Sequence, residues 1–168
     1  MNSSVNAEPP HAHHPPPPVV IVPFEPRHAE AWKALNEDWI SRLFVIEPKD
    51  RIVLDDPVGQ VIAPGGRILM AEIEGRPVGC CALLRLEDGG YELAKMAVDE
   101  TVRGRGIGKR LMAAAIERAR GLNAPRLYIE TNSSLANAIG LYAAHGFVHL
   151  PPRPTPYARA DVWMELRL

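Results

Sequence analysis

The segment from residue 91 to residue 131 constrains the fold of this chain more than any other. It has a strand pattern at 91–98, a helical pattern that ends at Gly121, and a second strand pattern at 126–131. The apolar residues of the helical pattern are Ile107, Leu111, Met112, Ala115, Ile116 and Ala119. Because a strand–helix–strand unit within one sheet forms a right-handed parallel crossover, the sheet is expected to contain a parallel pair of strands.

The other elements are expected from the same kinds of pattern. In chain order they are a strand at 19–22, a helix at 29–43, loops with at most a short helix at 47–66, strands at 67–74 and 78–87, a helix containing Leu135, Ile139 and Tyr142, and strands at 147–150 and 161–168. Turns at 75–77 and 88–90 join three of the strands tightly, which predicts an antiparallel meander. The expected fold is α/β (α+β), with a mixed, mostly antiparallel central sheet of about seven strands and helices on both faces.

Composition divides the chain into a tail and one domain. Residues 1–18 hold six prolines and three histidines but one charged residue, so a disordered Pro/His-rich tail is expected there. Residues 19–168 are long enough for a single domain with a hydrophobic core. The tail histidines, His11, His13 and His14, are assigned no metal, because a flexible segment offers no preformed geometry.

Charge and hydropathy exclude several classes of protein. The net charge of −1 argues against a nucleic-acid binder held by bulk charge. Neither a membrane span nor a secretory signal is recognisable, so a cytoplasmic protein without membrane contact is expected. The two cysteines, Cys80 and Cys81, are adjacent and cannot bridge distant segments.

The turn at 104–108 has three glycines in five positions, between the strand at 91–98 and the next helix. Glycine lets the backbone turn sharply and leaves its N–H groups uncovered, and a helix N-terminus adds about half a positive charge. Four cationic side chains lie within eight residues: Arg103, Arg105, Lys109 and Arg110. The turn therefore predicts a site for a diphosphate.

Two other nucleotide-binding motifs do not match this turn. A P-loop ending at Gly108 and Lys109 would need glycine at position 103 and Ser or Thr at position 110, but both positions are Arg. A G-x-G-x-x-G motif starting at Gly104 would need glycine at position 109, which is Lys, and would normally follow the first strand of an alternating sheet. The pattern present is R-x-x-G-x-G between a strand and an amphipathic helix.

With this turn the chain resembles the GNAT superfamily of N-acyltransferases, in which the pyrophosphate of acyl-coenzyme A binds at such a turn. The resemblance covers residues 19–168 and is most specific from Tyr91 to Phe147. Residues 92–98 resemble the family's fourth strand, and residues 131–135 and 138–147 resemble its fifth strand and the following helix. The resemblance implies acetyl-coenzyme A as co-substrate, no metal, and direct attack by a primary amine in a ternary complex.

The resemblance also implies which residues hold the coenzyme. It implies that the fourth and fifth strands diverge near the thioester, which frees backbone N–H groups for the acyl carbonyl and the pantetheine arm. The expected cofactor-binding residues are Ala97, Val98, Arg103, Gly104, Arg105, Gly106, Ile107, Gly108 and Lys109.

Acyl transfer to an amine needs a base, because an alkylamine with a pKa near 10.4 is almost fully protonated at neutral pH. Glu92 is the expected base, since it stands six residues before Val98, the spacing found in family members that use a catalytic Glu. Glu130, at the end of the neighbouring strand, is the alternative base, and water alone remains a third option.

Tyr142 matches the tyrosine with which many relatives protonate the departing thiolate, and it is the expected general acid. Its helical spacing from Leu135 and Ile139 suits core packing equally well. Many relatives carry Asn seven residues before this Tyr, where this chain has Leu135. Asn132 is expected instead to cap the helix or to line the substrate mouth.

The amine acceptor, a small molecule or a peptide, is expected between the first helix with its following loop and the final hairpin. The candidate residues are Trp39, Arg42, Phe44, Glu47, Asp50, Asp55 and Asp56 on one side, and Arg153, Tyr157 and Arg159 on the other. The acidic residues suit a polyamine or a basic peptide, whereas the arginines suit a carboxylate-bearing amine. Both readings stay open.

Two other classes of function stay open beside the enzyme. The first is a non-catalytic module that binds acyl-coenzyme A for regulation. The second is an interaction protein that uses its proline tail. Glu92 and Tyr142 argue against the first, and the cluster from Arg103 to Lys109 argues against the second. Homodimers are common among relatives, but the sequence does not decide the oligomeric state.

Overall fold

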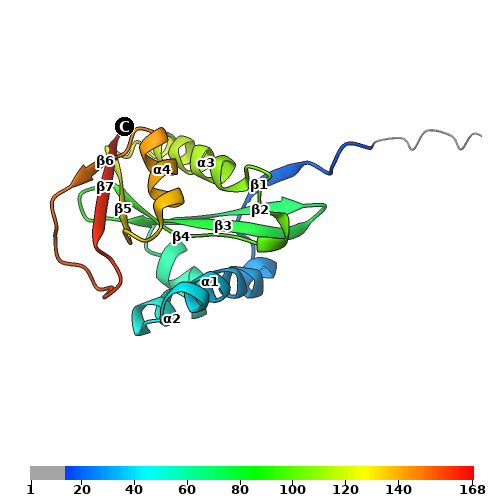
Figure 1. Ribbon diagram of the computed structural model, residues 1–168, viewed down its shortest axis with the longest axis horizontal. Coiled ribbons are helices and arrows are strands. Elements are labelled where there is room, and N and C mark those ends of the chain that lie inside the picture. Colours follow the sequence, from blue (N-terminus) through cyan, green and yellow to red (C-terminus); the bar gives the residue numbers. More distant parts are fainter. Residues whose placement is uncertain (1–13) are drawn as a thin grey trace, which may run out of the picture.

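A computed structural model describes residues 14–168 as a mixed seven-stranded sheet with helices on both faces (Figure 1). The sheet order is β1-β2-β3-β4-β5-β7-β6. The strands are β1 (Val19–Pro23), β2 (Arg67–Ile73), β3 (Arg76–Arg85), β4 (Tyr91–Val98), β5 (Arg126–Thr131), β6 (Val148–Leu150) and β7 (Val162–Arg167). The pairing of β4 with β5 is parallel and the other pairings are antiparallel, which confirms the predicted fold class.

The helices lie in two layers. They are α1 (Ala29–Leu43), α2 (Pro48–Asp55), α3 (Ile107–Gly121) and α4 (Ala136–Ala144), with short helical turns at Pro26–His28, Val58–Ile62 and Glu100–Val102. Figure 1 shows α1 and α2 on one face of the sheet, and α3 and α4 on the other. No helix within residues 14–168 combines the length and the apolar composition that a membrane crossing requires.

Each face of the sheet has its own hydrophobic cluster. On the α3 side, Leu111 and Met112 are fully buried against β2, β3 and β4, and on the α1 side Trp32 is fully buried against the same strands. Because β2 and β3 are covered on both faces, their sequences are nearly continuous apolar runs, as in a central strand of an α/β protein. Burial of this kind is the main stabilising contribution to the fold.

The turn between β2 and β3 differs from the expected position at 75–77. Glu74 and Gly75 both have positive φ, 51° and 77°, and form the two-residue turn, so that β3 already begins at Arg76. Pro77 consequently lies inside a strand. The β2–β3 register shifts next to Pro77. A sheet tolerates a residue without an N–H group at such an irregularity.

The predicted short helix in 47–66 is α2, and its start is well defined by the sequence. Pro48 occupies the first turn, and Glu47 and Asp50 form a capping box around it. This cap places both carboxylates near the central strand β4: Asp50 contacts Lys95 of β4, and both carboxylates contact the loop between β6 and β7.

Candidate active site

The strands β4 and β5 pair over two residues and then diverge. The paired residues are Tyr91 with Leu127 and Glu92 with Tyr128. Beyond them the two strands leave a gap in the centre of the sheet, which agrees with the divergence that the family resemblance implies. Glu92 lies at the point where the gap begins.

An irregularity in β4 shapes one wall of the gap. The register with β3 shifts between Cys80 and Ala82, and Lys95, opposite this shift, has a φ of 54°. A non-glycine residue in this left-handed region is strained and marks a bulge that turns the strand. The bulge lies between Glu92 and Val98, so it separates the two ends of the predicted site.

The amide of Val98 is available to a ligand. The next amide, that of Asp99, donates to the carbonyl of Val78 on β3 at 2.8 Å. Because successive amides of a strand point in opposite directions, the Val98 amide points toward the gap, where β5 is no longer paired. The Ala97 amide accordingly points toward β3, near the Cys80 sulfur. Of these two predicted residues, Val98 therefore offers its N–H to the gap, and Ala97 lines it.

The predicted anion-binding turn, residues 103–109, forms a cradle at the N-terminus of α3. Gly104 and Gly106 have φ values of 81° and 71°, and apart from their chain neighbours no heavy atom of residues 14–168 lies within 4 Å of the position a Cβ would take at either residue. Outside the local helix backbone and the adjacent residues, the nearest part of the described chain to such a Cβ on Gly108 is a Leu141 side-chain carbon at 3.9 Å. The cradle is thus open above its first helical amides, and it can hold an anion there.

The four cations of this segment do not all face the cradle. Arg103 and Lys109 line it, whereas Arg105 and Arg110 donate to the carbonyls of Pro17 and Val19 at the start of the described chain. The Arg105 contact measures 2.6 Å. Arg105 therefore holds the N-terminal segment in this structure, and its predicted role toward a diphosphate remains a prediction. His14, in the same segment, is exposed, and His11 and His13 lie outside the described residues.

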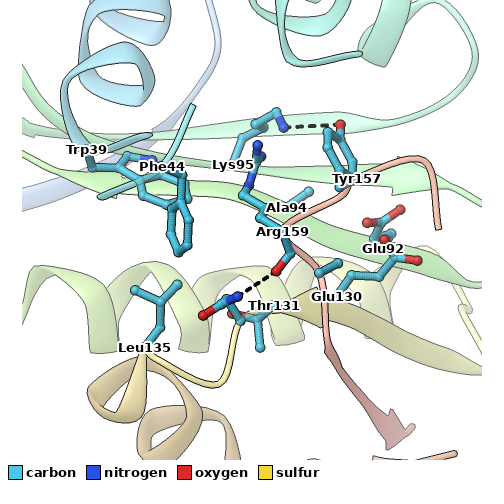
Figure 2. A pocket seen from close by; sticks show the side chains of 12 residues that line it. Trp39, Phe44, Glu92, Ala94, Lys95, Glu130, Thr131, Leu135, Tyr157 and Arg159 are labelled. Carbon is cyan, nitrogen blue, oxygen red and sulfur yellow. Dashed lines mark hydrogen bonds between the residues drawn. The ribbon is translucent and has the colours of Figure 1, made fainter. Parts of the chain in front are cut away.

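Three adjoining hollows connect the cradle with Glu92. The cradle shares Val98, Arg103 and Leu141 with a middle cavity of about 270 Å³, which lies at the gap between β4 and β5 and is bordered by α4. The middle cavity in turn shares Trp39, Glu130 and Leu135 with an inner pocket of about 70 Å³. The inner pocket is lined by Trp39, Phe44, Glu92, Ala94, Lys95, Glu130, Thr131, Asn132, Leu135, Tyr157, Arg159 and Ala160 (Figure 2).

Glu92 and Glu130 lie side by side in the inner pocket (Figure 2). Burial raises the pKa of Glu92 to about 7, and the nearby negative charge of Glu130 contributes to the shift. Glu130 accepts hydrogen bonds from the hydroxyls of Tyr128 at 3.0 Å and Thr155 at 2.6 Å. A carboxyl with a pKa near 7 is well suited to proton transfer at neutral pH. Glu130 is instead held in place by two neutral donors.

Tyr142 lines the middle cavity from α4, and its ring packs against Phe147 with centroids 6.0 Å apart. Burial raises the pKa of Tyr142 to about 12. A phenol with this pKa keeps its proton at neutral pH and can donate it. The structure therefore places Tyr142 both against the core and at the cavity, and this position is compatible with core packing and with the predicted role as general acid.

A buried ionic cluster joins three distant segments beside the inner pocket. Asp50 of α2 accepts from Lys95 Nζ at 2.7 Å and, through both oxygens, from Arg159 at 2.7 Å each. Arg159 also contacts Glu47 at 3.2 Å, and Lys95 Nζ donates to the Tyr157 hydroxyl at 3.2 Å. Burial alone would raise the pKa of Asp50, but these hydrogen bonds outweigh it and lower the pKa to about 2. The cluster fixes the β6–β7 loop against α2.

Replacement of Asp50 by Asn should destabilise the protein by about 3 to 5 kcal/mol, because it leaves the buried Lys95 without its counter-charge and weakens the pairing of Arg159. Urea unfolding at pH 7 measures the change. Asp55→Asn is the matched control on the same helix: its exposed ion pair with Lys33 should contribute less than about 1 kcal/mol. Equal losses in the two variants would contradict a stabilising role of the cluster. Since the pKa of Asp50 is lowered, its contribution is present above pH 4 and lost as the pH falls toward 2.

The remaining acceptor candidates divide into two groups. Trp39, Phe44, Tyr157 and Arg159 line the inner pocket, and Asn132 lines it too while donating to the Arg159 carbonyl at 2.6 Å. The others lie elsewhere: Asp55 pairs with Lys33, Asp56 accepts from the Gly59 amide, Arg42 pairs with Glu100 and Asp38, and Arg153 stacks on Tyr128.

Lys95 was missed by sequence reasoning, since a lysine in a strand gives no signal of a bulge or of a buried ion pair.

The comparison with known families decides the identity of this fold. The model of the acetyltransferase (GNAT) family matches residues 22–147, most of the described chain. The chain belongs to the GNAT family. In GNAT terms, the cradle is the R-x-x-G-x-G turn after the fourth strand, and the gap is the divergence of the fourth and fifth strands. Within residues 14–168, no group of three or more His, Cys, Asp or Glu side chains is placed to hold a metal ion.

Relatives of known name agree with this family. The chain is 38% identical over 90 residues to the uncharacterized N-acetyltransferase YjgM of Escherichia coli, which covers 52% of this chain and 54% of that protein. It is 33% identical over 131 residues to the mycothiol acetyltransferase of Clavibacter michiganensis, covering 74% of this chain and 40% of that protein. The chain thus spans about half the length of the curated relatives it matches first.

Solved GNAT structures share the fold over most of the chain. An acetyltransferase of the GNAT family from Staphylococcus aureus superposes with a TM-score of 0.80 at 21% identity, covering 89% of this chain and 99% of that one. The structure of yncA from Salmonella typhimurium, a putative acetyltransferase with its cofactor acetyl-CoA, superposes with a TM-score of 0.70 at 16% identity, covering 89% and 94%. At these identities the likeness establishes the fold alone.

Proposed function

We propose that this chain is an N-acetyltransferase that transfers an acetyl group from acetyl-coenzyme A to a primary amine, by direct attack in a ternary complex. One observation carries the proposal: the cradle, the middle cavity and the inner pocket adjoin, so an anion-binding turn is connected with a carboxyl of raised pKa. Membership of the GNAT family and the acetyltransferase names of the relatives support it.

The residues present fit the coenzyme. The glycine turn is open above the first amides of α3, and Arg103 and Lys109 line it, so a diphosphate would be held by backbone N–H groups and two cations. The Val98 amide would bind the pantetheine arm in the gap, where β4 is no longer paired with β5. When bound, the coenzyme supplies a thioester, which is an activated acyl group for an amine.

Two residues would manage the protons. Glu92 takes a proton from the incoming ammonium or amine. Its raised pKa makes its carboxylate a stronger base than an exposed carboxylate, and with a pKa of about 7 a fraction of it is still ionised at neutral pH. Tyr142 holds a proton at the middle cavity and donates it to the leaving thiolate. Glu130 and water are the alternatives for the first role.

The proposal is tested by thiol release from acetyl-coenzyme A in the presence of a panel of primary amines. Amine-dependent release above the hydrolysis background is the expected result. If no amine is acetylated, calorimetry with acetyl-coenzyme A distinguishes two explanations. Binding of acetyl-coenzyme A without turnover would indicate a non-catalytic acyl-coenzyme A module. Absence of binding would contradict the assignment of the cradle.

Replacement of Tyr142 by Phe should lower kcat by about tenfold to a thousandfold, because it removes the proton donor and keeps the ring packing against Phe147. The calorimetric Kd for acetyl-coenzyme A should change less than about threefold. Phe147→Leu is the control for packing, since it disturbs the same aromatic contact and leaves the hydroxyl. An undiminished kcat in Tyr142→Phe would return Tyr142 to a purely structural role.

A further inference from the structure

The charges around the inner pocket suggest which amines it accepts, and this inference rests on the proposed function. The sequence offers acidic residues that suit a polyamine and arginines that suit a carboxylate. In the structure most of these charges neutralise each other. Arg159 is bound by Asp50 and Glu47, and Lys95 is bound by Asp50.

The other arginines near this region are no freer to bind a carboxylate. Arg42 contacts Glu100 at 2.6 Å and Asp38 at 3.2 Å. Arg153 lies over the Tyr128 ring and does not line the inner pocket. Among residues 14–168, every cation that lines the inner pocket therefore already has a carboxylate partner, and an acceptor carboxylate would have to displace one.

Negative charge, in contrast, is left over. The Glu92 carboxyl makes no hydrogen bond or ion pair to any residue of the described chain, and it is mostly buried. Glu130 receives hydrogen bonds from two hydroxyls, which carry no charge to offset its own. Two carboxyls without cationic partners in one pocket attract a cation and repel an anion.

The opposite side of the pocket is apolar. Trp39 and Phe44 pack edge to face with their ring centroids 6.4 Å apart, and Figure 2 shows them across the pocket from Glu92 and Glu130. Leu135 lines both the inner pocket and the middle cavity. With about 70 Å³, the inner pocket has room for a compact group.

We propose that the acceptor is a compact primary amine with an apolar or aromatic body and without a carboxylate. Its ammonium group lies at Glu92 and Glu130, and its body lies against Trp39 and Phe44. Free amino acids are excluded by the two carboxyls, and the second charge of a diamine would fall on the apolar wall.

Three acceptors of related shape test the proposal: isopentylamine, leucine and leucinamide, measured by thiol release from acetyl-coenzyme A. Isopentylamine should exceed leucine in kcat/KM by roughly a hundredfold, because the carboxylate of leucine meets Glu92 and Glu130. Leucinamide, which has lost that charge, should exceed leucine at least about tenfold. If leucinamide and a peptide amide that begins with leucine are both used efficiently, the acceptor amine can be the N-terminus of a peptide.

Several results would overturn this inference while leaving the proposed function intact. These are leucine used as well as isopentylamine, leucine used as well as leucinamide, or putrescine preferred to isopentylamine. No thiol release with any amine would instead count against the proposed function itself. The two failures are therefore distinguishable.

Two variants connect the preference to the named residues. Glu130→Gln should reduce the ratio of the kcat/KM for isopentylamine to that for leucine by about tenfold, since it removes one of the two negative charges. Trp39→Ala should raise the KM for isopentylamine and leave the KM for ethylamine, which is too short to reach the wall, within about twofold. An unchanged ratio in the first variant, or equal KM changes in the second, would contradict the assigned walls of the pocket.

Discussion

Replacement of Glu92 by Gln should lower kcat/KM by a factor of about 10² to 10⁴, because it removes the proposed base without changing the shape of the side chain. In the wild type the rate should rise with pH up to about 7, the pKa to which burial and Glu130 raise this carboxyl. The variant should lack that rise. Profiles of both proteins with the same amine make the comparison, because the titration of the amine then cancels. A rise that persists in Glu92→Gln would point to Glu130 or to water.

The same substitution should stabilise the fold at high pH. The folded pKa of Glu92 is raised above its ordinary value of 4.5, so the native state retains a proton between about pH 4.5 and 7 that the unfolded chain has lost. Stability therefore falls with rising pH in this window, and the loss is complete above pH 7. At pH 8.5 Glu92→Gln should be more stable than the wild type by at most about 3 kcal/mol, and at pH 4 the two should be similar.

Urea unfolding of both proteins at pH 4, 6 and 8.5 tests this expectation. A gain in stability together with a loss of activity is the signature of a residue retained for function. Equal stabilities at all three pH values would mean that Glu92 is less buried and less perturbed than the geometry indicates. Leu84, its partner on β3, offers a control: Leu84→Val should shift the stability by the same amount at each pH.

Replacement of Gly108 by Val should raise the Kd for acetyl-coenzyme A by about a hundredfold or more. A Cβ in an α-helix points toward the helix N-terminus, so the valine at this position covers the amides of the cradle. The fold itself should tolerate the change. The Cβ would lie 3.9 Å from Leu141, an ordinary contact, and the backbone of Gly108 is helical.

Gly121→Val is the matched control, at the opposite end of the same helix. Beyond the adjacent residues and the local helix backbone, no heavy atom described by the structure lies within 4 Å of a Cβ there, and Gly121 lines neither the cradle nor the middle cavity. Calorimetry should find unchanged affinity in this variant, and thermal unfolding should find both variants close to the wild type. Unchanged affinity in a folded Gly108→Val would mean that the coenzyme binds without the cradle.

The elements that bear the site could be predicted from the sequence where their signals are local. The strands at 91–98 and 126–131 have the bounds that their patterns predicted, and the helix between them ends at Gly121 as expected. The glycine turn is equally local, since glycines at alternating positions before an amphipathic helix permit the positive φ values that the turn has. Glu92 and Tyr142 became candidates because their places within such segments match those of residues in GNAT relatives, and their roles stay predictions.

What the sequence could not show are contacts between distant segments. Asp50 meets Lys95 across 45 positions and Arg159 across 109, and no periodicity reports such pairs. Arg105 faces a carbonyl 88 positions away, although its place in the turn suggested a phosphate contact. The conflict of charges around the acceptor was therefore unresolvable until the ion pairs were known. The bulge at Lys95 was equally hidden, because a positive φ at a lysine has no sequence signal.

A crystal structure of the protein with coenzyme A tests the central claim most directly. The pyrophosphate should lie over the amides at residues 104–109, and the pantetheine arm should pass the Val98 amide, with its sulfur in the middle cavity on the side of Tyr142. A coenzyme bound outside the gap between β4 and β5, or a pyrophosphate away from the cradle, would contradict the account.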